Sequence, residues 1–122
     1  MRHKFNIKLH IHPKYHRDIR LFMIAHDLTL EGGLEKAIRV SLKKCESREF
    51  REQFIKLPDP PTGADEGTKD HIYWLDHSLK EPVAEMCEVF RQEFDRTTIT
   101  FGKNAFLYRA IHYFMKTDKA AE

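Results

Sequence analysis

The stretch Lys4-Phe5-Asn6-Ile7-Lys8-Leu9-His10-Ile11-His12 alternates apolar and polar residues without a break. Alternation with a period of two residues is typical of a β-strand that buries one face. The predicted inner face carries Phe5, Ile7, Leu9 and Ile11. The predicted outer face carries Lys4, Asn6, Lys8, His10 and His12, none of which is acidic.

The polar outer face of this strand has two interpretations. A two-stranded ribbon fits the major groove of DNA, where Asn, Lys and His side chains reach base edges. A polar edge strand that resists aggregation would carry the same residue types. The alternation alone does not separate the two, and the segments that follow favour the first.

Composition predicts one compact soluble domain, or two small halves sharing a core, because 41% of the 122 residues are hydrophobic and 33% are charged. No apolar run approaches membrane-spanning length and no secretory signal is visible, so a cytoplasmic protein without a membrane partner is expected. Cys45 and Cys87 form no CxxC pair, which favours small core residues in a reducing compartment.

The charge is unevenly distributed along the chain. Residues 1–48 contain 11 Lys and Arg against 5 Asp and Glu, whereas residues 49–122 contain 10 against 14. The net charge of +2 therefore divides into +6 and −4. This asymmetry indicates a face that meets a polyanion, with chance clustering of solvated charges as the alternative.

Two helices are predicted after the first strand. Pro13 suits a first helical turn and begins a helix that extends to about His26. Thr29 is a good N-cap for a second helix, which we expect to continue as far as Leu57. Gly32 and Gly33, in its first turns, would allow a phosphate or another backbone to come close.

The second half repeats this order. Residues 58–68 are rich in Pro and Gly and predict a linker, and Lys69–Leu75 predicts a second strand. Helices are expected from about Lys80 and from Gly102 or Lys103 to about Lys116. Strand-helix-helix therefore occurs twice, which is an internal repeat in a mostly helical α+β fold.

These features resemble the ribbon-helix-helix DNA-binding family, the group of the Arc, MetJ and CopG repressors. Ile7–Ile11 stands where the family has its strand, and Thr29–Ile38 stands where it has a capped helix with an Ala-Ile pair. Tyr108-Arg109-Ala110-Ile111 aligns with Glu35-Lys36-Ala37-Ile38. The resemblance covers residues 4–44 and, less closely, 69–116.

The resemblance implies a single-chain pseudo-dimer. Family members pair two strands from two subunits, so a tandem chain would pair its own strands within one domain of residues 1–122. The units would be residues 4–57 and 69–116, sharing a two-stranded antiparallel ribbon. Among tandem forms, the chain is similar to accessory proteins of conjugative and T-DNA transfer, which implies double-stranded DNA and relaxases or other transfer proteins as partners.

By this resemblance, Asn6, Lys8 and His10 would contact bases. The second strand has two possible registers, since a slip of one residue exchanges its faces. In one register, Ile72 and Trp74 are buried, and the base-contacting residues are Lys69, His71 and Tyr73. In the other, Tyr73 and Leu75 are buried and Trp74 faces outward. We favour the first register. In either register the two strands differ in sequence, which predicts a DNA site that is not a true palindrome.

The family also binds phosphates at the N-terminus of the second helix of each unit, where unpaired N–H groups and the helix dipole suit an anion. The matching residues are Thr29 and Leu30 in the first half and Thr100 and Lys103 in the second. Glu31 is an unfavourable charge beside a phosphate. Arg2 and Lys4 would reach the flanking backbone.

Other functions have less support in the sequence. The eight histidines have no zinc-type spacing, and no phosphate-binding glycine loop or nucleophile motif is present, so no metal, cofactor or catalytic residue is expected. Within DNA binding, the alternative is a transcriptional repressor. Outside it, the alternative is a protein-docking or antitoxin-like module.

Overall fold

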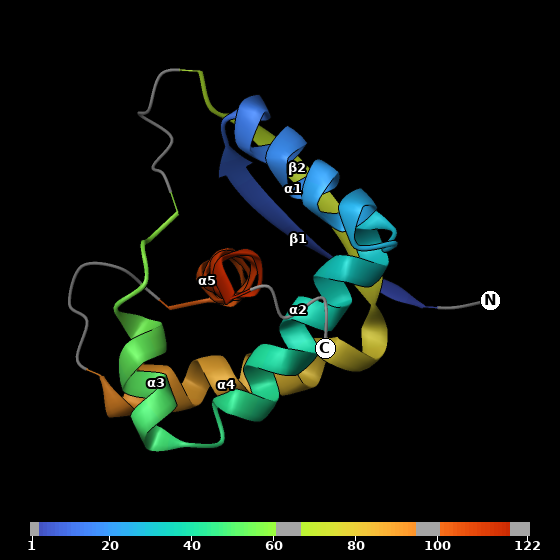
Figure 1. Ribbon diagram of the computed structural model, residues 1–122. Coiled ribbons are helices and arrows are strands. Elements are labelled where there is room, and N and C mark those ends of the chain that lie inside the picture. Colours follow the sequence, from blue (N-terminus) through green and yellow to red (C-terminus); the bar gives the residue numbers. More distant parts are fainter. Residues whose placement is uncertain (1–2, 61–66, 95–100, 118–122) are drawn as a thin grey trace.

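The computed structural model describes residues 3–60, 67–94 and 101–117. The elements, in chain order, are β1 (Lys4–Ile11), α1 (Pro13–Ala25), α2 (Leu30–Lys44), α3 (Arg48–Ile55), β2 (Lys69–Asp76), a 3-10 turn (His77–Leu79), α4 (Lys80–Glu93) and α5 (Lys103–Thr117) (Figure 1). The fold is therefore α+β and mostly helical, and the described residues form five α-helices and one two-stranded antiparallel sheet.

β1 and β2 pair with each other in a ribbon, with Lys4 opposite Asp76 and Ile11 opposite Lys69. The inner face of β1 is as predicted, because Phe5, Ile7, Leu9 and Ile11 are all buried. α5 contacts β1 and α2 contacts β2, so these two helices cover the inner face of the ribbon. α3 lies at the end of the molecule away from the ribbon, and α4 runs from the end of β2 toward it (Figure 1).

The register that we favoured for the second strand is wrong. Tyr73 and Leu75 are 3% and 0% exposed, whereas Ile72 and Trp74 are 53% and 49% exposed. Tyr73 and Leu75 lie opposite Ile7 and Phe5 and continue the same inner face. The Tyr73 hydroxyl lies 2.8 Å from Nδ1 of His16, and this hydrogen bond removes the cost of burying a phenol.

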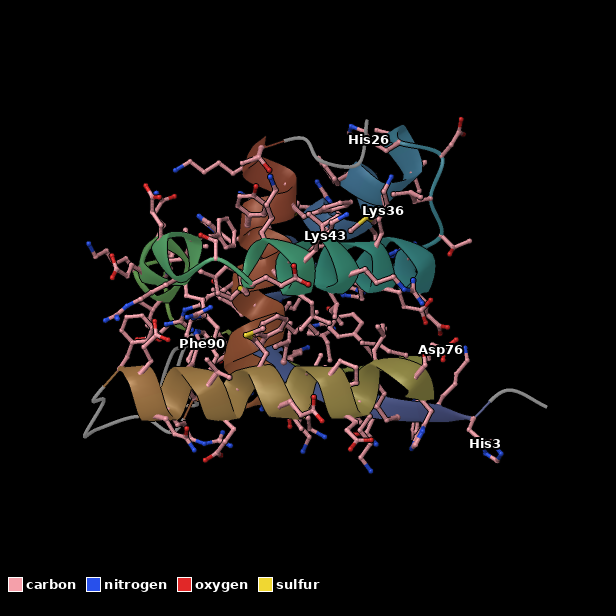
Figure 2. The ribbon with its side chains drawn as sticks, turned by 90° about the horizontal axis from the view of Figure 1, so that it is seen from below. His3, His26, Lys36, Lys43, Asp76 and Phe90 are labelled. Atoms are coloured by element: carbon pink, nitrogen blue, oxygen red, sulfur yellow. The ribbon has the colours of Figure 1, made fainter. Side chains whose placement is uncertain are left out.

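The core centres on α2 packed against α5. The two helices bury the same sequence pattern, Leu-x-x-Ala-Ile, which is Leu34, Ala37 and Ile38 in α2 and Leu107, Ala110 and Ile111 in α5. α1 packs on α2 in the first half and α4 packs on α5 in the second. Figure 2 shows Phe90 of α4 directed into this core, where its side chain is almost fully buried.

The junction between α1 and α2 is built as the sequence predicted. Asp27 has φ of 57°, and the Leu28 N–H donates to the Met23 carbonyl at 2.8 Å, so α1 ends in a left-handed cap. Thr29 then caps α2, because its hydroxyl accepts from the Gly32 N–H at 3.0 Å.

The two glycines of α2 serve this junction. A Cβ on Gly33 would lie 2.1 Å from the Met23 sulfur, and one on Gly32 would lie 2.7 Å from the Thr29 hydroxyl oxygen. We had expected the missing side chain of Gly33 to make room for a phosphate or another backbone. Instead, the Met23 side chain of α1 occupies that space.

The second helix is shorter than expected. α2 ends at Lys44, and Ser47 begins α3 by accepting from the Phe50 N–H at 3.4 Å. Arg51 of α3 donates to Glu93 of α4 at 2.8 and 3.1 Å and to the Cys45 carbonyl at 2.8 Å. The break lets α3 turn back onto α4, which a continuous helix to Leu57 would prevent.

Buried polar and sulfur groups complete the core. The guanidinium of Arg109 is fully buried and donates to Asp59, at the start of the predicted linker, at 2.5 Å. Cys45 and Cys87 are buried thiols, which confirms their prediction as core residues. No helix among the described residues has both the length and the apolar content needed to cross a membrane.

Candidate nucleic-acid interface

The outer face of the ribbon places three residues of β1 beside three of β2. Asn6 lies opposite Trp74, Lys8 opposite Ile72, and His10 opposite Asp70. The three β1 residues, and Trp74 of β2, alternate with buried residues, whereas Asp70 lies between the exposed Lys69 and the half-buried His71. All six except the half-buried His10 are exposed. The surface therefore combines an amide, a cation and an imidazole with two large apolar side chains and one carboxylate.

His10 is held by polar neighbours on both ring nitrogens. Its Nδ1 lies 2.7 Å from the Asp70 carboxylate, and the Thr68 hydroxyl lies 2.6 Å from its Nε2. The hydrogen bond from His10, with Lys8 nearby, lowers the pKa of Asp70. Lys8 lies 3.9 Å from Asp70, so this end of the face is internally balanced in charge and His10 is less available to a base edge than we expected.

Asp70 was missing from the predicted site. The sequence carried a signal for it, because Asp70 shares a face with Ile72 and Trp74 in any regular strand. Burying Ile72 and Trp74 would have drawn a carboxylate toward the core, which is costly. That cost favours the observed register.

The residues that we expected to face DNA from β2 lie elsewhere. Tyr73 is buried, and His71 is half-buried with its ring stacked on His16 of α1 at 4.3 Å. Burial lowers the pKa values of His71 and His16 and raises that of Tyr73. Lys69 is exposed at the start of β2 but lies opposite Ile11, on the same face as His71 and Tyr73, so it does not share the outer face with Asn6 and Lys8. His71 and Tyr73 are therefore corrected from base contacts to a contact with α1.

The N-terminus of α2 carries an ion pair. Lys4 Nζ lies 2.6 Å from the Glu31 carboxylate, and both side chains remain partly exposed. Thr29 uses its hydroxyl to cap the helix, and Leu30 is half-buried. Lys4 and Glu31 thus neutralise each other where the resemblance placed a phosphate contact.

The N-terminus of α5 is more basic. Lys103 is exposed and donates to the Asn6 carbonyl at 2.9 Å, which sets its ammonium at the edge of the ribbon. A Cβ on Gly102 would meet nothing within 4 Å. Gly102 and Lys103 line a depression together with Lys80 and Arg91 of α4. Arg91 also donates to the Phe101 carbonyl at 2.5 Å. Arg2 and Thr100, the other predicted phosphate contacts, lie outside the described residues.

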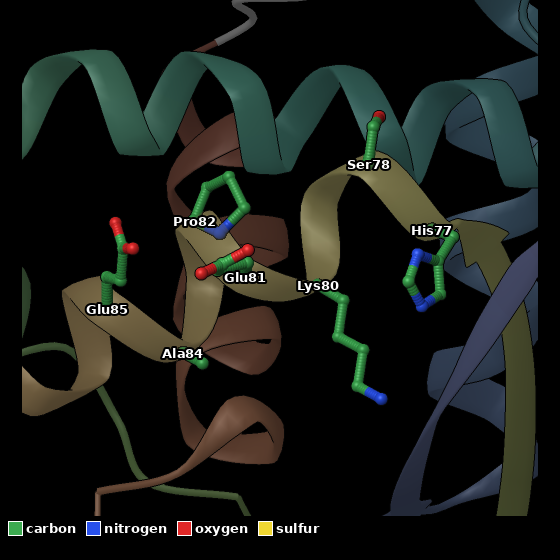
Figure 3. A pocket seen from close by; sticks show the side chains of 7 residues that line it. All are labelled: His77, Ser78, Lys80, Glu81, Pro82, Ala84 and Glu85. Atoms are coloured by element: carbon green, nitrogen blue, oxygen red, sulfur yellow. The ribbon is translucent and has the colours of Figure 1, made fainter.

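An open depression at the start of α4 offers no comparable chemistry. Figure 3 shows the side chains of Lys80, Glu81 and Glu85 around it, so charges of both signs are mixed. Within residues 3–60, 67–94 and 101–117, no three His, Cys, Asp or Glu side chains are grouped so as to hold a metal ion.

No protein-family model, no characterised protein and no solved structure that was compared with the chain matches it. The function is therefore inferred from the residues of the ribbon and of the helix ends beside it. Lys8 and Asn6 are the predicted base-contacting residues that the fold leaves exposed and side by side on one strand.

Proposed function

We propose that this chain is a tandem ribbon-helix-helix protein that binds double-stranded DNA by inserting its β-ribbon into the major groove. The single observation that carries the proposal is the outward, exposed position of Asn6 and Lys8 on a ribbon whose other face is covered by helices. A two-stranded ribbon of this kind fits the major groove.

The repeated contacts of the two halves support a pseudo-dimeric arrangement. α2 contacts β2 while α5 contacts β1, and α2 and α5 bury the same Leu-x-x-Ala-Ile pattern against each other. In a dimeric family member, two subunits would supply these elements. Here one polypeptide supplies both, so the protein would bind DNA as a monomer.

The base contacts would come from β1. Asn6 suits adenine and Lys8 suits guanine, and each good pair discriminates by about 1–3 kcal/mol against the wrong base. β2 presents Ile72 and Trp74 at the matching positions, so the two halves of the bound site would differ in sequence.

The phosphate contacts would be unequal as well. The α5 N-terminus supplies backbone N–H groups together with the Lys103 ammonium, which is a favourable setting for a phosphate. The α2 N-terminus carries Glu31, so its contact would be weaker. Lys69, exposed at one end of the ribbon, adds a cation there.

The role that we propose is an accessory function in conjugative or T-DNA transfer in the bacterial cytoplasm. It comes from the resemblance to tandem ribbon-helix-helix proteins, and in particular to the Agrobacterium virulence protein of the C operon that promotes T-DNA transfer at the overdrive sequence. A relaxase or another transfer protein would then act on the same DNA. Footprints near promoters, with none near a transfer origin or border, would instead favour a repressor.

Salt-dependent binding to a labelled random duplex tests the DNA-binding proposal. We expect tight binding at low salt that weakens steeply as salt is raised, because phosphate contacts release counterions. Lys8→Ala should weaken binding, whereas Lys43→Ala, which removes the same charge at the far end of α2, should change it little (Figures 1 and 2). Circular dichroism would check that both variants are folded.

Two results would count against this function. Absence of duplex binding at every salt concentration would exclude it, and capture of a protein partner by the same chain would then support a docking module. Equal affinity of Lys8→Ala, Lys43→Ala and the unaltered protein would remove β1 from the interface.

A further inference from the structure

The outer face of β2 exposes two large apolar side chains in the middle of a polar ribbon. Ile72 is 53% exposed and Trp74 is 49% exposed, and they alternate with the buried residues Tyr73 and Leu75. Single exposed apolar side chains are ordinary, but two adjacent ones on a candidate binding surface indicate a contact with a partner.

Their position relates them to the proposed base-contacting residues. Ile72 lies directly opposite Lys8, and Trp74 directly opposite Asn6. Side chains opposite each other in an antiparallel pair have Cβ atoms about 4.5–5.5 Å apart. A ligand bound by Lys8 and Asn6 would therefore also touch Ile72 and Trp74.

The chemistry of the major groove limits what Ile72 can contact there. Base edges in that groove display hydrogen-bond donors and acceptors, with the C5 methyl of thymine as the apolar group. An isoleucine side chain against a polar edge would displace water without replacing its hydrogen bonds, which costs free energy. Contact with a thymine methyl carries no such cost, because both surfaces are apolar.

We propose that Ile72, assisted by Trp74, recognises thymine methyl groups in the half of the DNA site that lies under β2. This inference rests on the proposed function. The bound duplex is divided into a part read by hydrogen bonds from β1 and a thymine-containing part read by apolar contact from β2. Double-stranded DNA is the occupant because Lys8 lies directly opposite Ile72, and Lys103 is held at the backbone of Asn6, the residue opposite Trp74; both ammonium groups complement a polyanion.

The test removes the methyl group alone. Duplexes that the protein enriches from a random pool at low salt are resynthesised with deoxyuridine in place of thymidine, and their affinities are compared. The unaltered protein should bind the deoxyuridine duplexes about fourfold more weakly for each methyl contacted, the value expected for one buried methyl group. Ile72→Ala should bind the two kinds of duplex equally.

Matched controls separate this effect from a general loss of affinity. Lys8→Ala should bind both duplexes more weakly and keep the full ratio between them. Trp74 is the one tryptophan in the sequence, so its emission should change on adding the thymidine duplexes. Ile72 is exposed, and the thermal unfolding curve of Ile72→Ala should match that of the unaltered protein.

The outcomes distinguish a failure of thymine-methyl recognition from a failure of the proposed DNA binding. Salt-dependent binding with equal affinity for both kinds of duplex overturns methyl recognition and leaves DNA binding intact. A ratio that persists in Ile72→Ala also overturns it. Absence of duplex binding at every salt concentration overturns both, and a protein bound through Ile72 and Trp74 would then account for their exposure.

Discussion

The imidazole rings of His16 and His71 stack on each other, with centroids 4.3 Å apart and planes inclined by 15°. His16 belongs to α1 and His71 to β2, so the stack joins the first helix to the ribbon. Nδ1 of His16 lies 2.8 Å from the Tyr73 hydroxyl. Burial lowers the pKa of both rings. The nearby His71 and then Arg20 lower the pKa of His16 further, and Lys69 lowers that of His71.

This stack predicts that the protein loses stability as the pH falls below about 6.5, the ordinary pKa of histidine. The unfolded chain then binds protons that the folded chain does not, so the free energy of unfolding decreases until the pH reaches the lowered folded pKa values. Asp70 partly opposes the effect at His71. Urea unfolding at several pH values would measure the slope, and His16→Gln should reduce it.

The control for this prediction is His77→Gln, which alters an exposed histidine. It should leave the pH dependence unchanged. If His16→Gln and His77→Gln gave the same curve as the unaltered protein, the stacked pair would not be the cause.

Gly33→Ala should destabilise the protein by about 1–3 kcal/mol, although alanine is the better helix former. The reason is the Met23 sulfur, which lies 2.1 Å from where the new Cβ would be placed. Gly102→Ala is the matched control, because its Cβ would meet nothing within 4 Å. The test compares the thermal unfolding of the two variants with that of the unaltered protein. A Gly33→Ala variant more stable than the unaltered protein would show that α1 does not pack against α2 at Gly33.

Ile7→Asp should abolish folding, because it places an unpaired carboxylate at a fully buried position of β1. Its neighbour Asn6 is exposed, so Asn6→Asp should leave the fold intact while weakening DNA binding through repulsion of phosphate. Far-UV circular dichroism and size-exclusion chromatography would compare them. A folded Ile7→Asp would mean that the inner face of the ribbon is not part of the core.

Cys45 and Cys87 should resist thiol reagents in the native protein at about pH 8. Burial raises the pKa of Cys45 to about 12 and that of Cys87 to about 11, so the reactive thiolate is scarce as well as inaccessible. Both thiols should react quickly in denaturant. Rapid stoichiometric modification without denaturant would contradict this placement of the two residues.

Glu31→Gln should tighten DNA binding if the proposed function holds. The change removes a negative charge from the α2 N-terminus and releases Lys4 from its 2.6 Å ion pair, leaving its ammonium available to a phosphate. One added phosphate contact should steepen the salt dependence by about 0.9 in log-log slope. Glu49→Gln, in the first turn of α3, is the control, and equal effects of the two changes would exclude a local contact at α2.

The sequence by itself determined the features that depend on residues close together in the chain. Strict alternation identified β1 and its buried face, and Pro13 and Thr29 marked where two helices begin. Each of these follows from periodicity or capping within a few residues, so no distant contact was needed. The exposure of Asn6 and Lys8 was predictable for the same reason.

Only the tertiary structure decided the features that depend on distant partners. β2 has apolar residues on both faces, so its register was settled by pairing with β1 and by the hydrogen bond between Tyr73 and His16. The break before α3 depends on Arg51 reaching Glu93 across the fold. Local patterns cannot encode such choices, because the free energy that separates the alternatives comes from side chains far away in the chain.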